Sequence, residues 1–404
     1  MNLPAFESNQ YKVGVLPTIT QFNSSFKGTG NNQAVPSLAL ISGEKTKSKL
    51  DKYCDFGYYT GLTAACLQVV SGLAFMALAI KKGGKRFLNV GKEIIDKKKA
   101  INGKASAEII PKKGKKLLKE LSKTDKILNR IGTAAWATGC FISVPSLFGS
   151  GVKQQQPGLV LNGILWGLIA PFMALNLPTR LLGISNIAYV PAFASFVNQI
   201  NNESDPNKAK NPRKMNMDFI FDKKAWKNVL NSGEEGQKVR KNWLDFVKFC
   251  GEDQKIAFKT TLTAIKDTTT QSVDYFSGKR EKAPDIFSMK PSKESMSLAS
   301  ILVLAGGLPK IILGKKDMGG LLTEKGLKVA DHLIGAGMIF DSLGMITLAN
   351  SKEDSRKPIV LGLTPLRIAG DFRQERMFPL GLRTLGGASI EYYYALMNKD
   401  EKPH

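Results

Sequence analysis

The chain has 404 residues, a net charge of +24 and a mean hydropathy of −0.12. This length excludes a single small domain and leaves two or three soluble domains or one polytopic membrane domain. The distribution of charge decides between them, because residues 81–130 hold 17 Lys/Arg and five Asp/Glu whereas residues 131–200 hold only Lys153 and Arg180. A soluble helix needs a polar face, so a long stretch with two charges favours burial in a bilayer.

The amino-terminal part combines a polar tail with a first apolar helix. Residues 1–50 are rich in Asn, Ser, Gly and Lys, which predicts a flexible polar tail, and they lack the pattern of a cleaved signal peptide. Within residues 51–80, the stretch 58–80 is uncharged, begins at two tyrosines and is followed by lysines. As a helix it would be about 34 Å long, enough to cross the hydrocarbon core. We therefore expect the first transmembrane helix at 51–80.

Residues 81–130 are predicted to be a basic, cytoplasmic, amphipathic segment. Leucines recur there at helical spacing among lysines. Two interpretations stay open: adhesion to anionic lipid headgroups, or a solvated loop that sets topology. The lysines expected to contact headgroups are Lys115, Lys116, Lys119, Lys123 and Lys126. We do not expect nucleic-acid binding, because the run lacks interleaved aromatic residues.

Three apolar segments follow within residues 131–200. Segments 131–148 and 158–175 predict a transmembrane hairpin, and 181–197 predicts a third apolar helix that spans, re-enters or lies in the interface. Gly163 and Gly167 form a GxxxG pair, a spacing that lets two helices approach closely in lipid. These glycines are therefore predicted to be helix-packing residues.

The remaining chain alternates between polar and apolar again. Residues 201–295 predict a polar insertion of two or three helices that face water, docked to one another or to the membrane surface. Residues 296–350 predict a second transmembrane hairpin, formed by 296–314 and 332–349. Residues 351–404 are too interrupted by charge to span, so we expect an interfacial or re-entrant region. In it, Tyr392 to Tyr394 would lie at headgroup level and 384–387 would form a glycine turn.

The fold class expected from this pattern is all-α, because no strand signal is present. We expect a polytopic helical membrane protein with five or six spans and a soluble helical insertion. The apolar spans lead us to expect a multi-pass protein of the cell membrane, and the excess of Lys and Arg predicts that segment 81–130 lies on the cytoplasmic side.

Asp341 is the only acidic residue well inside a candidate span. On a helix it shares a face with Gly337 and Gly344, so it is expected to point toward a neighbouring helix. Lys310, on the preceding antiparallel span, is the nearest candidate cation. Three interpretations remain open: a paired or proton-handling carboxylate, a protonated or hydrogen-bonded structural residue, or a helix N-cap in a broken span.

Other chemistry has no sequence signal. The four cysteines are scattered and only two histidines are present, and no phosphate-binding loop, zinc-protease or nucleophile-elbow motif occurs. We therefore predict no catalytic residue, no metal site and no cofactor.

The expected function is that of a non-enzymatic integral membrane protein with a structural or interaction role. Its expected partners are the lipid bilayer with its anionic headgroups, and either other proteins or a second copy of the chain. A transporter or channel component that uses Asp341 is the first alternative. A membrane-bound enzyme of unknown reaction is the second.

Overall fold

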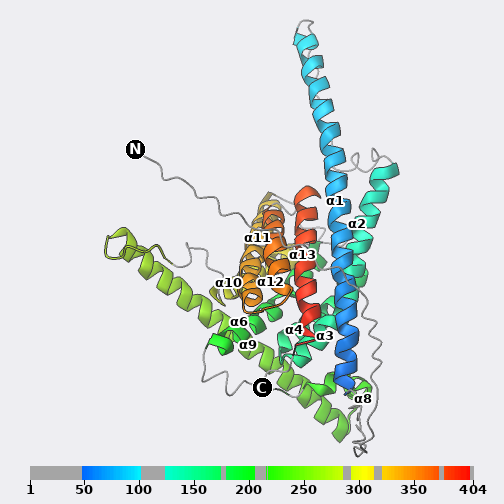
Figure 1. The fold of residues 1–404 in the computed structure, drawn as a ribbon, viewed down its shortest axis with the longest axis vertical. Helices are drawn as coiled ribbons and strands as arrows, with labels where there is room; N and C mark the ends of the chain where they lie inside the picture. The colour runs from blue at the N-terminus through cyan, green and yellow to red at the C-terminus, as the bar shows by residue number, and fades with distance from the viewer. Residues whose placement is uncertain are drawn as a thin grey trace, which may run out of the picture. The chain divides into compact units, whose positions relative to one another are not determined.

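The computed structural model describes residues 48–101, 123–173, 179–204, 215, 217–284, 293–313, 321–372 and 377–400. Figure 1 shows that these residues form helices, with no strand among them, which confirms the predicted all-α class. All of them belong to one unit, residues 47–404. Almost all of the predicted polar tail at 1–50, and the segment 102–122 with Lys115, Lys116 and Lys119, lie outside the described residues.

The amino-terminal half contains six helices in the described residues. They are α1 (Lys49–Ile101), α2 (Lys123–Ile142), α3 (Val144–Lys153), α4 (Pro157–Met173), α5 (Thr179–Ile187) and α6 (Val190–Ser204). The polar insertion follows as a short 3-10 helix η1 (Asp218–Phe221), α8 (Lys223–Asn228) and α9 (Glu234–Phe276). The last four are α10 (Lys293–Leu313), α11 (Leu321–Asn350), α12 (Arg356–Asp371) and α13 (Met377–Met397).

Four helical stretches of the described residues are long and apolar enough to cross a membrane. They are Lys49–Gly83, Lys123–Lys153, Lys293–Leu313 and Lys325–Asn350. The predicted five or six spans are therefore wrong for this part of the chain. The apolar part of α4, Pro157–Ile169, is too short. The segment 181–197 is divided between α5 and α6, and Pro191 stands at the start of α6, where its missing N–H costs no helical hydrogen bond.

The long helices form an antiparallel series in which each element packs against the next. Helix α1 lies between α2 and α13, and the order then continues through α12, α11 and α10. Glycines set the closest approaches: a Cβ atom at Gly72 of α1 would lie 2.8 Å from the carbonyl oxygen of Gly381 on α13. Likewise, a Cβ at Gly337 of α11 would lie 2.6 Å from a methyl carbon of Val303 on α10. Such close approach of backbones is typical of helices that associate in lipid, where the hydrophobic effect between helices is weak.

Ion pairs join the helices at both ends of this series. At one end, hereafter the Lys81 end, Lys81 of α1 pairs with Asp125 of α2 at 3.0 Å, and Lys310 of α10 pairs with Asp331 of α11. At the opposite end, hereafter the Lys399 end, Lys399 pairs with Asp55 of α1. Antiparallel packing thus places the charged ends of the candidate spans in two separate layers.

Arg356 adds a second ionic contact at the Lys399 end. Its guanidinium donates to Asp354 at 2.9 Å and to Asp400 at 2.6 Å. The side-chain hydrogen bond from Arg356 holds the pKa of Asp354 below its usual value. The carboxylate of Asp354 therefore remains charged to lower pH than that of a free aspartate.

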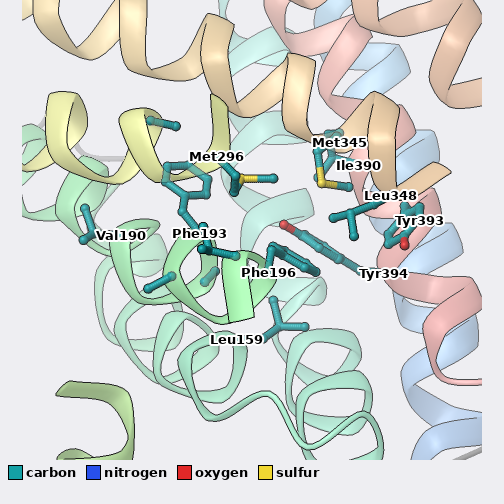
Figure 2. Packing of buried hydrophobic residues seen from close by; sticks show 14 of the residues in the cluster. Leu159, Val190, Phe193, Phe196, Met296, Met345, Leu348, Ile390, Tyr393 and Tyr394 are labelled. Carbon is teal, nitrogen blue, oxygen red and sulfur yellow. The ribbon is translucent and has the colours of Figure 1, made fainter. Parts of the chain in front are cut away.

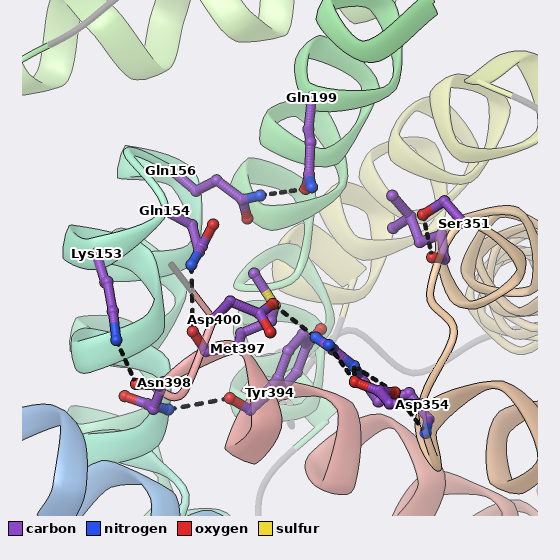
Figure 3. Close-up of polar contacts among 12 residues, drawn as sticks. Lys153, Gln154, Gln156, Gln199, Ser351, Asp354, Tyr394, Met397, Asn398 and Asp400 are labelled. Carbon is purple, nitrogen blue, oxygen red and sulfur yellow. Dashed lines mark hydrogen bonds and ion pairs between the residues drawn. The ribbon is translucent and has the colours of Figure 1, made fainter. Parts of the chain in front are cut away.

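Polar side chains also cap the end of α13, as Figure 3 shows. Lys153 donates to the carbonyl oxygen of Asn398 at 2.9 Å, and Gln154 donates to that of Met397 at 3.2 Å. Asn398 itself donates to the carbonyl oxygen of Ser146 at 3.1 Å. The last carbonyl groups of a helix have no intrahelical partner, so these contacts anchor α13 to α3.

The core brings α13 into the middle of the protein. Phe196 of α6 stacks on Tyr394 with ring centroids 6.0 Å apart, and Leu348 and Met345 of α11 pack beside them (Figure 2). Tyr393 is fully buried and Tyr394 is 6% exposed. These two tyrosines therefore pack among helices, because α1 and α12 cover α13 on both sides. Their predicted position at headgroup level stays a prediction.

The polar insertion docks on the bundle through α9. Its buried face includes Asp253, which is 1% exposed. Asp253 accepts a hydrogen bond from Ser195 of α6 at 2.9 Å and one from Asn198 at 3.1 Å. Ser195 in turn accepts from the backbone N–H of Gly158, in the first turn of α4. One carboxylate thus connects α9 to α6 and, through Ser195, to α4.

We expect Asp253→Ala to loosen this docking. Hydrogen bonds to a charged group contribute about 1.5–3 kcal/mol each, so the variant should expose α9 to protease and lower the free energy of unfolding. Limited proteolysis and denaturant titration measure the two effects. Asp245→Ala, at an exposed acid of the same helix, is the matched control and should leave both unchanged. Equal effects of the two variants would contradict the assigned role of Asp253.

Candidate functional site

Asp341 lies buried near the middle of α11. It is 3% exposed, and along the helix it is roughly 15 Å from both Asp331 and Asn350. Helix α11 is continuous through this position, so the N-cap interpretation of Asp341 is wrong. Gly337 and Gly344 both pack on α10, against Val303 and Met296, whereas the carboxylate of Asp341 pairs with α12. Asp341 therefore sits inside the protein, away from both ends of its helix.

The partner of Asp341 is Arg367 of α12. The guanidinium Nη2 of Arg367 lies 2.5 Å from Oδ2 of Asp341, and the arginine side chain is 8% exposed. The sulfur of Met338, one turn earlier on α11, lies 3.7 Å from the same nitrogen. A buried carboxylate and a buried guanidinium in this geometry form a desolvated ion pair.

Lys310, predicted to be the nearest candidate cation to Asp341, pairs elsewhere. It contacts Asp331 at the Lys81 end, about three helical turns from Asp341. The side chain of Asp331 is 41% exposed, so this contact lies at the surface. The expectation that Lys310 faces Asp341 is therefore wrong, and the alternative fate of a lysine near a helix end, reaching the polar boundary, describes it better.

The Asp341–Arg367 pair continues into a longer cluster of charges. Arg367 Nε lies 4.0 Å from Asp371, one turn further along α12. Asp371 has a fully buried side chain, and its Oδ1 lies 2.8 Å from Nε of Arg383 on α13. The cluster thus draws on three helices, and its two aspartates and two arginines balance in charge. We call these four residues, Asp341, Arg367, Asp371 and Arg383, the buried charge cluster.

Two glycines make room for the arginines of the cluster. A Cβ at Gly386 of α13 would lie 2.4 Å from the backbone nitrogen of Arg367. Reciprocally, a Cβ at Gly370 of α12 would lie 2.3 Å from the backbone nitrogen of Arg383. Each arginine therefore faces a glycine of the opposite helix. The glycine turn predicted at 384–387 is wrong, since these residues are helical and Gly386 serves close packing.

Several buried polar atoms in and near the cluster lack a hydrogen bond among the described residues. They include Nη1 of Arg367, Oε2 of Glu391 and both carboxylate oxygens of Asp371, although Asp371 forms ion pairs. Glu391 on α13 lies close enough to Arg367 to interact with its charge. Buried polar atoms are usually hydrogen-bonded, so this side of Arg367 has unused donor capacity. It is the feature of the cluster that most suggests a role beyond packing.

Sequence reasoning did not single out Arg367, Asp371, Arg383 or Glu391. A signal was present, because Arg367 and Asp371 are four residues apart in a largely apolar segment, and such a pair shares a helix face. The charges in this segment instead predict a region too interrupted to span a membrane. The structure buries it because the charges neutralise one another across α11, α12 and α13.

The other predicted positions take simpler roles. Gly163 and Gly167 of α4 face Leu147 and Val144 of α3, so they pack within the first hairpin. Lys123 and Lys126 are exposed in the first turn of α2. Their predicted contact with lipid headgroups stays a prediction. Within the described ranges, no group of three or more His, Cys, Asp or Glu residues is arranged to hold a metal ion.

The cluster can hold three helices together, and it keeps charged groups inside the protein near the middle of α11. Its carboxylates are engaged by guanidinium groups, which keep a fixed positive charge at all ordinary pH values. Comparisons with protein-family models, with curated proteins and with solved structures found no match for this chain.

Proposed function

We propose that the protein is a non-enzymatic integral membrane protein with a structural or interaction role. The observation that carries this proposal is the set of four helical stretches with the length and composition of membrane spans. The separation of ion pairs into a Lys81 end and a Lys399 end supports it, since the charged ends of membrane spans lie at the two boundaries of the hydrocarbon core.

The pairing of the interior charges favours a structural role over a reaction. An isolated charge inside a bilayer costs about 2.5–3.5 kcal/mol on insertion scales, whereas a paired one is partly compensated. In the buried charge cluster every aspartate has an arginine partner within 4.0 Å. Such a cluster fixes the relative positions of α11, α12 and α13.

Membrane extraction tests the proposal. We expect the protein to sediment with membranes after carbonate washing and to become soluble only with detergent, because carbonate removes electrostatically attached proteins but leaves spanning helices in place. A soluble cytosolic protein and a peripheral basic protein in the same preparation are the controls. Recovery of the full-length chain in the carbonate supernatant would overturn the proposal.

A transporter or channel component is the second candidate. The observation in its favour is the buried Nη1 of Arg367 and Oε2 of Glu391, which lack hydrogen bonds among the described residues beside a mid-helix ion pair. Ion and proton flux in proteoliposomes tests it. Flux that disappears in folded Asp341→Asn protein supports transport, and equal flux in empty and loaded vesicles removes this candidate.

A further inference from the structure

Helix α9 carries a second apolar face that no described part of the chain covers. Its exposed large apolar side chains, taken together with the small residues Gly251 and Thr269, recur at spacings of three, four or seven residues. These spacings place them within about 80° of the helix circumference. We call this set the α9 stripe: Leu244, Val247, Phe258, Leu262, Ile265, Val273 and Phe276, each at least half exposed.

The α9 stripe differs from the face that docks on the bundle. The docking face includes Phe246, Asp253 and Ala257 and ends at Thr261, whereas the stripe continues for four more turns to Phe276. Figure 1 shows this later part of α9 running out beyond the other helices. Burial against the protein therefore does not account for the stripe.

A row of lysines borders the stripe on the side away from the docking face. The row consists of Lys241, Lys248, Lys255, Lys259 and Lys266, all exposed. Beyond it lie the exposed acids Asp245, Glu252 and Asp267. Around the helix the order is thus protein face, apolar stripe, lysines and acids. This order matches the succession from bundle to acyl chains, anionic headgroups and water.

The docking contacts place α9 at one end of the candidate spans. Gln254 donates to Ser300 of α10 at 2.9 Å, and Ser300 is about 10 Å along α10 from its first residue, Lys293. Asp253 is linked through Ser195 to the first turn of α4. Helix α4 directly follows α3, whose Lys153 contacts Asn398 at the Lys399 end. Helix α9 therefore crosses the bundle near the Lys399 end, close to where a bilayer surface would lie.

We propose that the α9 stripe lies in the bilayer interface, with its lysine row against anionic phospholipid headgroups. The proposal rests on the proposed function, since it needs spans that place a bilayer beside α9. The length of the stripe, its open position and the charge along one edge all fit a lipid surface. Two other occupants, a second copy of the chain and a protein partner, are distinguished by the experiment.

Site-specific fluorescence in reconstituted protein tests the proposal. The full chain, with exposed Cys66 replaced by serine, receives one bimane-labelled cysteine by Leu262→Cys on the stripe. Thr263→Cys, an exposed position about 100° further round the helix on the side of the acids, is the matched control. Interfacial helices lie about 5–10 Å into the headgroup–acyl boundary, so lipids brominated near the top of the acyl chain should quench the label at 262 much more than at 263.

A third label separates failure of the inference from failure of the proposed function. Leu73→Cys, at an exposed position within the first candidate span, should be quenched by brominated lipid whenever that helix crosses the bilayer. Quenching at 73 without quenching at 262 overturns the α9 inference alone. Absence of lipid quenching at both positions overturns both proposals. Protection of the label at 262 from lipid and from aqueous iodide would show a protein contact and would also overturn the inference.

The lysine row makes a separate prediction within the same experiment. In vesicles of phosphatidylcholine and phosphatidylserine, the triple variant Lys255→Glu, Lys259→Glu, Lys266→Glu should lose most of the quenching at 262. Salt should weaken the quenching of the unmodified row as well, because it screens exposed charges. The control is Lys238→Glu, Lys279→Glu, Lys282→Glu, which changes the same number of exposed lysines away from the row. Equal effects of the two triple variants would overturn the headgroup assignment.

Discussion

Asp341→Leu is expected to lower the free energy of unfolding by about 3–5 kcal/mol, because it leaves the guanidinium of Arg367 buried without its closest carboxylate. Arg367→Met should have a comparable effect, since it leaves both Asp341 and Asp371 with less compensation. The double variant should recover much of the loss, because an apolar pair of similar volume removes both desolvation costs. Unfolding in mixed detergent micelles measures all three.

The thermodynamic cycle identifies the partner of Asp341 directly. The effects of Asp341→Leu and Arg367→Met on the free energy of unfolding should be strongly non-additive. Those of Asp341→Leu and Lys310→Met should add, because Lys310 pairs with Asp331 at the Lys81 end. Lys310→Met alone should cost no more than about 1 kcal/mol, as is usual for a partly exposed pair. Additivity between positions 341 and 367 would contradict the direct pairing in the buried charge cluster.

The same variants separate the two candidate functions. A double variant that folds and still restores the phenotype of cells lacking the protein would show that the cluster is structural. A double variant that folds normally but abolishes ion flux in proteoliposomes would make it part of a conduction path. The stability measurement comes first, since an unfolded variant loses both properties for an uninformative reason.

Gly386→Ala should lower the free energy of unfolding by about 1–3 kcal/mol, because the added Cβ has no room between α13 and α12. It would lie 2.4 Å from the backbone nitrogen of Arg367, so the helices must separate. That separation should also weaken the coupling between Asp341 and Arg367. The mutational cycle repeated in the Gly386→Ala background measures this second effect.

Gly387→Ala is the matched control. Gly387 is the next residue on α13, and a Cβ there would meet no atom within 4 Å. Because alanine favours a helix over glycine by up to about 1 kcal/mol, this variant should be neutral or stabilising. Gly370→Ala and Gly362→Ala repeat the contrast on α12, where only the first position is crowded. Equal destabilisation by a crowded and an open glycine would contradict the close approach.

The distribution of charge along the chain was sufficient to predict the long apolar helices α1, α10 and α11. The uncharged stretch 58–80 lies within α1, and the two apolar segments of 296–350 lie within α10 and α11. The small-residue face around Asp341 was also predictable, because residues three and four apart share a helix face whatever surrounds them. Local periodicity determines these features, so no knowledge of distant residues is needed.

The tertiary structure alone decided which residues meet. Arg367 reaches Asp341 because α12 packs on α11, and no local pattern encodes that pairing. Hydropathy likewise did not show that α13 lies in the core, because Arg383 and Glu391 count as polar in the sequence while neighbouring helices balance or enclose their charges. In α9 the sequence contains two apolar faces, and only docking through Asp253 decides that the Phe246 face is buried and the Leu262 face remains open. Periodicity is a local property, whereas burial and ion pairing depend on residues far apart in the chain.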